Sequence, residues 1–231
     1  MHQLTLTNTT LLNNLLNLND CVFNNQEILD GLTARCRYIT DNINSNHIGY
    51  SNKYLEEALT YPVKDYSFPR CGYGVDTGYN NKRQSGYWHK IARPLLRPLI
   101  NYIGSDLNTL CMFYPSNGYL GWHHNGNAAG YTLVLTYSVD GDGYFKYYNQ
   151  HTNEYNVLQD SPGWNFRFGY YPDQDREPEN VFWHTAFTKK PRLTLGFIVP
   201  NRTMWRILIE ECCSLDKLPI DLSEIGPKED V

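Results

Sequence analysis

Hydrophobic positions divide the chain into a helical first part and a strand-rich second part. Between residues 25 and 44 the apolar side chains recur at intervals of three and four, the period of an amphipathic helix. A shorter helix is expected over residues 52–59, ahead of a proline. Helical character returns over residues 86–103, where Pro94 and Pro98 are expected to kink or divide the helix.

Three other stretches lack sustained periodicity. Residues 1–20, rich in Asn, Thr and Leu, predict either an edge strand or an adaptable arm. Residues 61–85 carry many glycines and tyrosines and indicate a long ordered loop or an irregular hairpin, a type of segment that often carries function. The acidic segment 219–231 is expected to fray.

After Gly104 short runs with strand character follow one another, separated by turn residues such as Pro162-Gly163 and Lys190-Pro191. Eight strands after a helical segment predict a mainly β fold with flanking helices (α+β), a sandwich or jelly roll with helices on one face. The expected strands cover residues 107–114, 119–124, 131–138, 144–148, 154–158, 165–170, 181–184 and 192–199.

Length and composition narrow the class of protein. A chain of 231 residues that is 41% hydrophobic suits one large domain. Within it we expect an N-terminal helical and loop region (1–104), a β core (105–210) and a C-terminal tail (211–231). The net charge of −4 provides no overall basic surface for nonspecific nucleic-acid binding. No apolar run is long enough to span a bilayer, and six cysteines without a CxxC pair predict reduced thiols in a cytoplasmic protein.

Candidate ligands for a metal ion stand at the ends of two predicted strands. His123 and Asn125 are two residues apart, so in an extended chain their side chains face the same way. A second expected strand ends in His184. Eight residues later Arg192 opens an alternating strand, from which a guanidinium can bind a carboxylate through two hydrogen bonds.

The order of Tyr114, His123-x-Asn125, His184 and Arg192 resembles the iron(II)/2-oxoglutarate-dependent oxygenases over residues 105–200. A tyrosine nine residues before the first histidine is similar to the nucleic-acid demethylase (AlkB-like) branch. The 61-residue gap between the histidines is similar to the prolyl hydroxylase branch.

The resemblance implies a double-stranded β-helix core, a jelly-roll variant. It also implies that Fe(II) is bound by three residues and 2-oxoglutarate by three others, with O2 as the second cosubstrate. The implied metal ligands are His123, Asn125 and His184. The implied 2-oxoglutarate residues are Tyr114 and Arg192, with Thr194 on the same face of the strand.

Asn125 departs from the family pattern, because that position normally holds a carboxylate. Four interpretations remain open. Asn125 is a neutral ligand or lies beside the metal in a working oxygenase; a carboxylate from elsewhere in the chain, with Asp140 or Asp142 the nearest in sequence, completes the metal site; or the metal site is degenerate and the protein only binds a ligand. In the fourth, the register shifts to His124-Asn125-Gly126, the halogenase form.

The sequence indicates less about the substrate than about the cofactors. Basic and aromatic residues are interleaved between residues 64 and 100, among them Arg70 and Phe68. They suit a nucleic-acid strand or a lid over a peptide. Because the protein is net acidic, we favour hydroxylation of a protein, peptide or small molecule. The alternatives are an AlkB-like nucleic-acid oxygenase and a non-catalytic jelly-roll binding protein. Arg167 either lines the pocket or forms an outward salt bridge.

Overall fold

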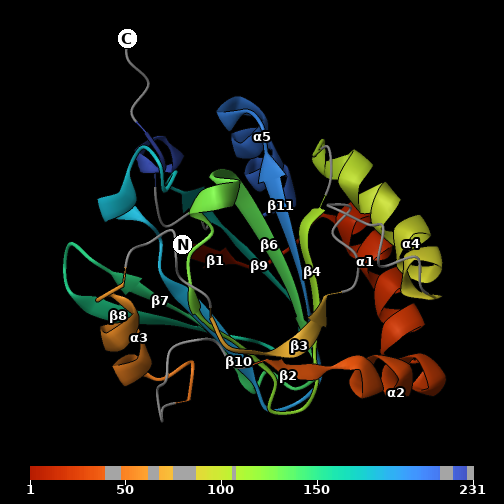
Figure 1. Ribbon diagram of the computed structural model, residues 1–231. Helices are drawn as coiled ribbons and strands as arrows, with labels where there is room; N and C mark the ends of the chain where they lie inside the picture. The colour runs from red at the N-terminus through yellow and green to blue at the C-terminus, as the bar shows by residue number, and fades with distance from the viewer. Residues whose placement is uncertain (40–47, 62–67, 75–86, 106–107, 214–220, 228–231) are drawn as a thin grey trace.

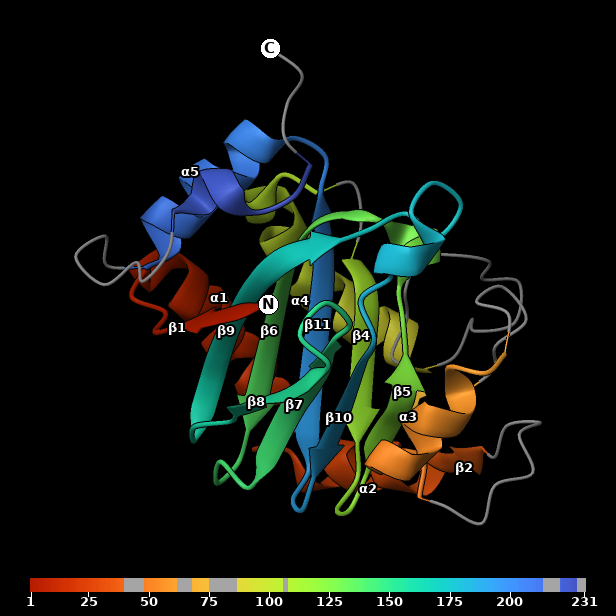
Figure 2. The same ribbon diagram turned by 90° about the vertical axis from the view of Figure 1, so that its left-hand side faces the viewer.

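The computed structural model describes residues 1–39, 48–61, 68–74, 87–105, 108–213 and 221–227. Within them, two antiparallel sheets face one another as a nearly closed barrel (Figure 2). The first sheet runs in the order β1 (His2–Leu4), β9 (Gly163–Tyr171), β6 (Gly130–Ser138), β11 (Arg192–Val199) and β4 (Asn108–Tyr114). The second contains β5 (Tyr119–His123), β10 (His184–Thr188), β7 (Gly143–Asn149) and β8 (Glu154–Gln159).

A short strand joins the two sheets along one side. β3 (Arg70–Gly74) pairs with β4 of the first sheet and with β5 of the second, and β2 (Arg37–Ile39) pairs with β3. From β4 to β11 the chain passes back and forth between the sheets, and only β7 and β8 are consecutive in one sheet. Antiparallel strands that alternate between two facing sheets form a jelly roll, so the expected mainly β core is confirmed.

Helices cover the outer faces of the two sheets unequally (Figure 1). Four of them share one apolar core with the first sheet, in which Leu15, Leu99 and Trp205 are almost fully buried. The smaller α3 (Asn52–Ala58) packs on the second sheet through Leu55 and Trp122. The four helices on the first sheet are α1 (Thr9–Val22), α2 (Gln26–Arg35), α4 (Tyr87–Ile103) and α5 (Arg202–Cys212).

The central strands of the first sheet, β6, β9 and β11, are mostly buried on both faces, but the two faces have different chemistry. On β11 the side chains of Leu193 and Leu195 point outward into the helical core. Arg192 and Thr194, at the alternate positions, line the cavity inside the barrel. Because strand side chains alternate between faces, the polar residues of a buried strand collect in the interior, where a ligand can reach them.

The structure corrects several boundaries. The helix expected over residues 25–44 ends at Arg35, where Cys36 takes an extended conformation that leads into β2. Residues 40–47 lie outside the described residues. The helix at 86–103 is not divided, because α4 runs from Tyr87 to Ile103 with both prolines inside it.

Other corrections concern the termini and the region before His184. The strand expected at 181–184 instead begins at His184, after a 3-10 turn at Pro178–Asn180. Residues 2–4 form the edge strand β1, whereas α1 and α5 were not predicted. Residues 70–74 of the expected loop form β3. In the described part of the tail, the carbonyl of Ser223 accepts a hydrogen bond from Arg202, so this part is held in place. Among the described helices, none combines the length and the hydropathy that a membrane span needs.

Candidate metal and cosubstrate site

Two histidines from neighbouring strands face one another at the end of the second sheet. His123 closes β5 and His184 opens β10, and the two residues are partners in the ladder, with their ring centroids 4.1 Å apart. In each ring Nδ1 lies 2.8 Å from a carbonyl oxygen two residues earlier, that of Gly121 or Phe182. A carbonyl only accepts, so each Nδ1 carries the proton and each Nε2 keeps its lone pair.

Burial holds both rings in the neutral form. His123 is 3% exposed and His184 is 4% exposed. Desolvation lowers the pKa of His123 to about 4, against a partial offset from the hydrogen bond to Gly121. Desolvation and the neighbouring His123 lower the pKa of His184 well below its ordinary value. Neutral imidazole is the form that coordinates a metal ion, so no proton has to be displaced from Nε2.

Aromatic side chains hold the two rings in place. Phe68 stacks on His123 at a centroid distance of 4.5 Å. Tyr171 lies nearly parallel to His184 at 5.3 Å with an interplanar angle of 3°, and Phe145 stacks at 5.2 Å on the same ring. These contacts limit rotation of the imidazoles and keep water away from them.

Asn125 lies next to the histidine pair. Its amide nitrogen is 3.3 Å from Nε2 of His184, and the amide hydrogen-bonds with the hydroxyl of Tyr171. Rotation of an amide group by half a turn exchanges the positions of its nitrogen and oxygen. Asn125 can therefore offer its carbonyl oxygen as a donor atom next to Nε2 of His184. Two imidazole nitrogens and one amide oxygen fit a divalent metal ion that accepts mixed nitrogen and oxygen ligands.

In the part of the chain that the structure describes, no carboxylate completes a metal site at this point. Within the described residues, no three His, Cys, Asp or Glu side chains are gathered so that they could hold a metal ion. Asp140 and Asp142 are exposed in the turn between β6 and β7. The next residue, Gly143, pairs with Thr188 at the far end of β10 from His184, roughly 13 Å along the strand. The interpretation that used these aspartates is therefore wrong.

The register-shifted interpretation also finds no support. It requires His124 as a ligand, but His124 contacts the edge of Trp183 at 5.0 Å, while His123 is the partner of His184. The first histidine of the pair is thus His123.

A cavity leads from the histidines to Arg192 inside the barrel. It is bordered by His123, Asn125 and His184 at one end and by Arg192 and Thr194 at the other. A second hollow opens on the outer side of the histidine pair and shares His123 and Asn125 with the first; Phe68 and Arg70 line it. The two spaces meet at His123 and Asn125.

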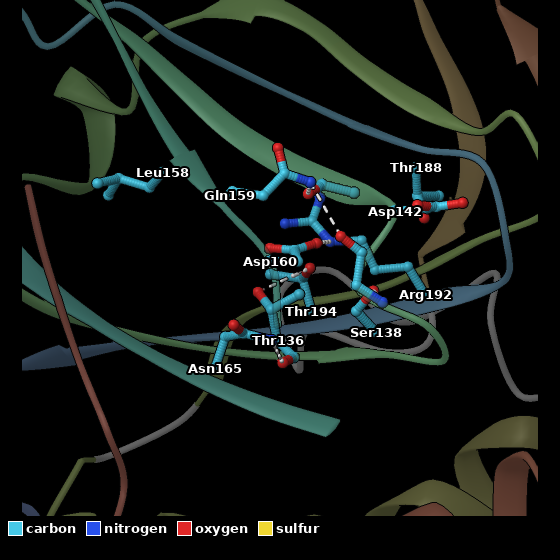
Figure 3. Close-up of polar contacts among 12 residues, drawn as sticks. Thr136, Ser138, Asp142, Leu158, Gln159, Asp160, Asn165, Thr188, Arg192 and Thr194 are labelled. Carbon is cyan, nitrogen blue, oxygen red and sulfur yellow. Dashed lines mark hydrogen bonds and ion pairs between the residues drawn. The ribbon is translucent and has the colours of Figure 1, made fainter. Parts of the chain in front are cut away.

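The inner end of the cavity combines a buried guanidinium with several hydroxyl groups. Arg192 is 1% exposed, and its guanidinium lies over the ring of Tyr114, its ladder partner on β4, at 5.4 Å. The hydroxyls of Thr194 and Thr136 are 3.4 Å apart across the β6–β11 ladder (Figure 3). Desolvation raises the pKa of Tyr114, and its hydrogen bond with Thr194 and the charge of Arg192 partly offset this. Tyr114 therefore stays a neutral hydroxyl that can donate a hydrogen bond.

A carboxylate that was not predicted lies beside Arg192. Asp160, directly after β8, is 4% exposed, and its Oδ2 is 3.2 Å from Nε of Arg192 (Figure 3). Its Oδ1 accepts a hydrogen bond of 2.5 Å from Arg167, which is fully buried. Arg167 was expected either to line the pocket or to form an outward salt bridge. It forms a salt bridge, but with a buried partner inside the barrel.

Asp160 and Tyr171 were not predicted, whereas Arg167 was considered as a pocket residue, and the three differ in the signal that the sequence carries for them. In the expected strand at 165–170, Arg167 stands between Phe166 and Phe168, and this alternation marks an arginine on an inward face. Tyr171 lies one residue past this expected strand and ends β9. Asp160 stands in a turn-like Asp-Ser-Pro-Gly stretch, and no local pattern distinguishes it from a surface turn residue.

Only part of the basic and aromatic segment can be placed. Phe68, Arg70, Tyr73, Arg93 and Arg97 are described, and of these Phe68 and Arg70 border the outer hollow. Lys64, Asp65, Tyr66, Asp76, Tyr79, Lys82 and Arg83 lie outside the described residues.

Comparisons with known proteins add no close relative. No protein-family model matches the chain, and no curated protein matches it. Solved structures that resemble it include a 2OG-Fe(II) oxygenase family oxidoreductase from Burkholderia pseudomallei, with a TM-score of 0.41 and 11% identity over 85% of this chain and 94% of that one. A prolyl-4-hydroxylase from Pseudomonas putida has a TM-score of 0.32 and 12% identity over 74% of this chain and 98% of that one.

The ribosomal oxygenase YcfD from Escherichia coli, solved with cobalt and 2-oxoglutarate, also resembles the chain, with a TM-score of 0.32 and 14% identity. That match covers 88% of this chain and 60% of YcfD, so the chain spans less than two thirds of that protein. Likenesses this loose do not assign a function.

Proposed function

We propose that this chain is an iron(II)- and 2-oxoglutarate-dependent oxygenase. One observation carries the proposal. A single cavity inside the jelly roll has two neutral histidines with unprotonated Nε2 atoms at one end and a buried arginine with two threonine hydroxyls at the other. A metal ion and a carboxylate are the ligands that these two ends prefer.

The metal would be held by Nε2 of His123, Nε2 of His184 and the amide oxygen of Asn125. The hydrogen bonds from Nδ1 to the carbonyls of Gly121 and Phe182 fix the tautomer and orient both rings. Asn125 brings no negative charge, so we expect weaker Fe(II) binding than a carboxylate ligand would give.

The cosubstrate would be held at its far carboxylate. Arg192 would donate to that carboxylate, and the hydroxyls of Tyr114 and Thr194, which line the same cavity, would donate as well. Bound iron(II), with O2 and 2-oxoglutarate, supplies the oxidation of a substrate C–H bond, with succinate and CO2 as the other products.

The chain's own contribution is binding, orientation and the exclusion of water. Phe145 and Tyr171 pack against His184 and keep the inner cavity apolar beside the metal ligands. The substrate would enter by the outer hollow, past Phe68 and Arg70. We propose a protein, peptide or small molecule as the substrate, hydroxylated at carbon.

The test is metal uptake and succinate formation by the purified protein under controlled O2. We expect the wild type to bind Fe(II) and to form succinate slowly without a prime substrate, and His184→Ala to lose both. Asn125→Asp adds the carboxylate that the position lacks, and we expect tighter Fe(II) binding by about tenfold.

The comparison of variants separates the alternatives. If neither the wild type nor Asn125→Asp takes up Fe(II), the protein is a binding module and the proposed function is wrong. A nucleic-acid substrate would appear as oligonucleotide binding that weakens steeply as salt rises, and peptide binding would not show that slope.

A further inference from the structure

Three buried charged side chains meet at the inner end of the cavity. Asp160 contacts Arg192 at 3.2 Å and Arg167 at 2.5 Å, and all three side chains are at most 1% exposed. Arg167 is held further by Gln3, whose side-chain oxygen accepts from Nε at 2.8 Å, and by the carbonyl of Leu158, which accepts from Nη2 at 3.2 Å. Asp160, Gln3 and Leu158 therefore hold the guanidinium of Arg167 in place.

The contact between Asp160 and Arg192 is an ion pair without an aligned hydrogen bond. Nε of Arg192 and Oδ2 of Asp160 are close, yet neither has a hydrogen-bond partner in the described part of the chain. Nη1 of Arg192 and Nη1 of Arg167 are also buried without a partner there. Buried donors without a partner are costly, and here they belong to cations beside a cavity.

The three charges do not cancel. Two guanidinium groups face one carboxylate, so the cluster keeps one net positive charge. Burial lowers the pKa of Arg167 to about 10, which still leaves it protonated at neutral pH. Among the described residues that line the cavity, Arg192 is the only one with a formal charge. A buried, uncompensated positive charge favours an anion in the empty space next to it.

We propose that Arg167 and Asp160 are positioning residues for the carboxylate site, in which Asp160 orients Arg192 and Arg167 supplies the positive charge that Asp160 removes. This inference rests on the proposed function. With Asp160 and Arg192 alone the site would be neutral, and an entering carboxylate would make it negative. With Arg167 present the loaded site is neutral, with two cations and two anions.

The backbone around Asp160 is adapted to its carboxylate. Gly143 on β7 faces Asp160, and a Cβ at Gly143 would collide with Oδ2 of the aspartate. The carbonyl of Gly143 accepts hydrogen bonds from the backbone of Asp160 at 2.8 Å and from the side chain of Gln159 at 2.7 Å. The absence of a side chain at 143 therefore makes room for a carboxylate held at a fixed place beside Arg192.

The experiment changes the net charge of the cluster by substitution and measures ligand binding instead of turnover. Arg167→Met lowers the net charge from one to zero, whereas Arg167→Lys keeps it. The double variant Arg167→Met/Asp160→Asn returns it to one without restoring Arg167. The ligands are 2-oxoglutarate and 2-oxopentanoate, which has the same five-carbon 2-oxo acid chain without the far carboxylate.

Binding is measured by calorimetry on the Mn(II)-loaded protein without O2, with a thermal melt for each variant. We expect Arg167→Met to bind 2-oxoglutarate about tenfold more weakly, because one nearby charge is lost. Its affinity for 2-oxopentanoate should stay at the wild-type value. Arg167→Lys and the double variant should bind 2-oxoglutarate within about threefold of the wild type.

Two results would overturn the inference. One is wild-type binding of 2-oxoglutarate by Arg167→Met. The other is an equal loss of both ligands that the double variant does not restore, which would mark Arg167 as a structural residue only.

A failure of the proposed function would look different, because the wild type would then bind neither 2-oxo acid. In that case glutarate binding to the metal-free protein tests the inference alone. Tighter binding by the wild type and the double variant than by Arg167→Met supports it, and equal or absent binding contradicts it.

Discussion

The two ends of the cavity differ in the charge of their buried polar groups and in how those groups are oriented. At the histidine end the groups are neutral, and each ring is oriented by a carbonyl two residues earlier in the chain. At the arginine end the groups are charged, and they are oriented by partners far away in the sequence, such as Gln3 for Arg167. The first end depends on local backbone geometry and the second on the balance of long-range charges.

The two ends also differ in whether a carboxylate side chain is present. The histidine end has Asn125 where a carboxylate was expected, while the arginine end has Asp160 where none was expected. A neutral end tolerates the loss of one group, because no charge is left uncompensated. A charged end does not, so substitutions there should cost more stability.

The largest expected effect is on stability at the arginine end. Asp160→Leu keeps a similar volume but leaves two buried guanidinium groups without their carboxylate. We expect a loss of about 3–5 kcal/mol in the free energy of unfolding, measured by urea denaturation. The matched change at the other end, His184→Leu, removes a neutral group and should cost about 1–2 kcal/mol. Equal losses would contradict the distinction between the two ends.

The next effect is on cosubstrate binding. Arg192→Met should weaken 2-oxoglutarate binding about 100-fold, because the charged donor at the inner end is lost. Mn(II) affinity should be unchanged, since the metal ligands are at the other end. Calorimetric titration of both ligands checks this, and a parallel loss of Mn(II) binding would show that the two ends are not independent.

A smaller effect is expected from a single hydroxyl. Thr194→Val keeps the shape of the side chain and removes one donor toward the carboxylate, so 2-oxoglutarate binding should weaken about fivefold. Thr185→Val is the control, because its hydroxyl donates to the carbonyl of Leu120 on the neighbouring strand and Thr185 does not border the cavity. An unchanged affinity of Thr194→Val for 2-oxoglutarate would show that the Thr194 hydroxyl does not bind the carboxylate.

The smallest effect is expected at the histidine end. Tyr171→Phe keeps the ring that stacks on His184 and removes only the hydroxyl that hydrogen-bonds with Asn125. Co(II) affinity, followed by its absorption spectrum, should change by less than about threefold. A larger loss would mean that Asn125 depends on this hydroxyl for its orientation.

The same distinction explains what could be predicted from the sequence. His123 and Arg192 are at strand ends, so a local pattern is enough to predict that they face the cavity. Asn125 also lines the cavity, but it lies past the end of β5, at the start of a 3-10 turn, and not in the extended chain that was expected. The helix over 9–22 was missed because its run of Asn and Thr has low helix propensity; its amphipathic face, with Leu11, Leu15 and Leu18, is stabilised by packing. Asp160 was missed because its role exists only after β7, β9 and β11 have come together.

The contact between Gln3 and Arg167 also constrains the order in which the protein can fold. The two residues are 164 positions apart, and β1 pairs only with β9 among the described strands. During synthesis the first strand has no partner until β9 has been made, and contacts of this range form slowly. The first strand therefore joins the sheet late, and the last hydrogen bond to Arg167 forms only when the beginning of the chain meets its second half.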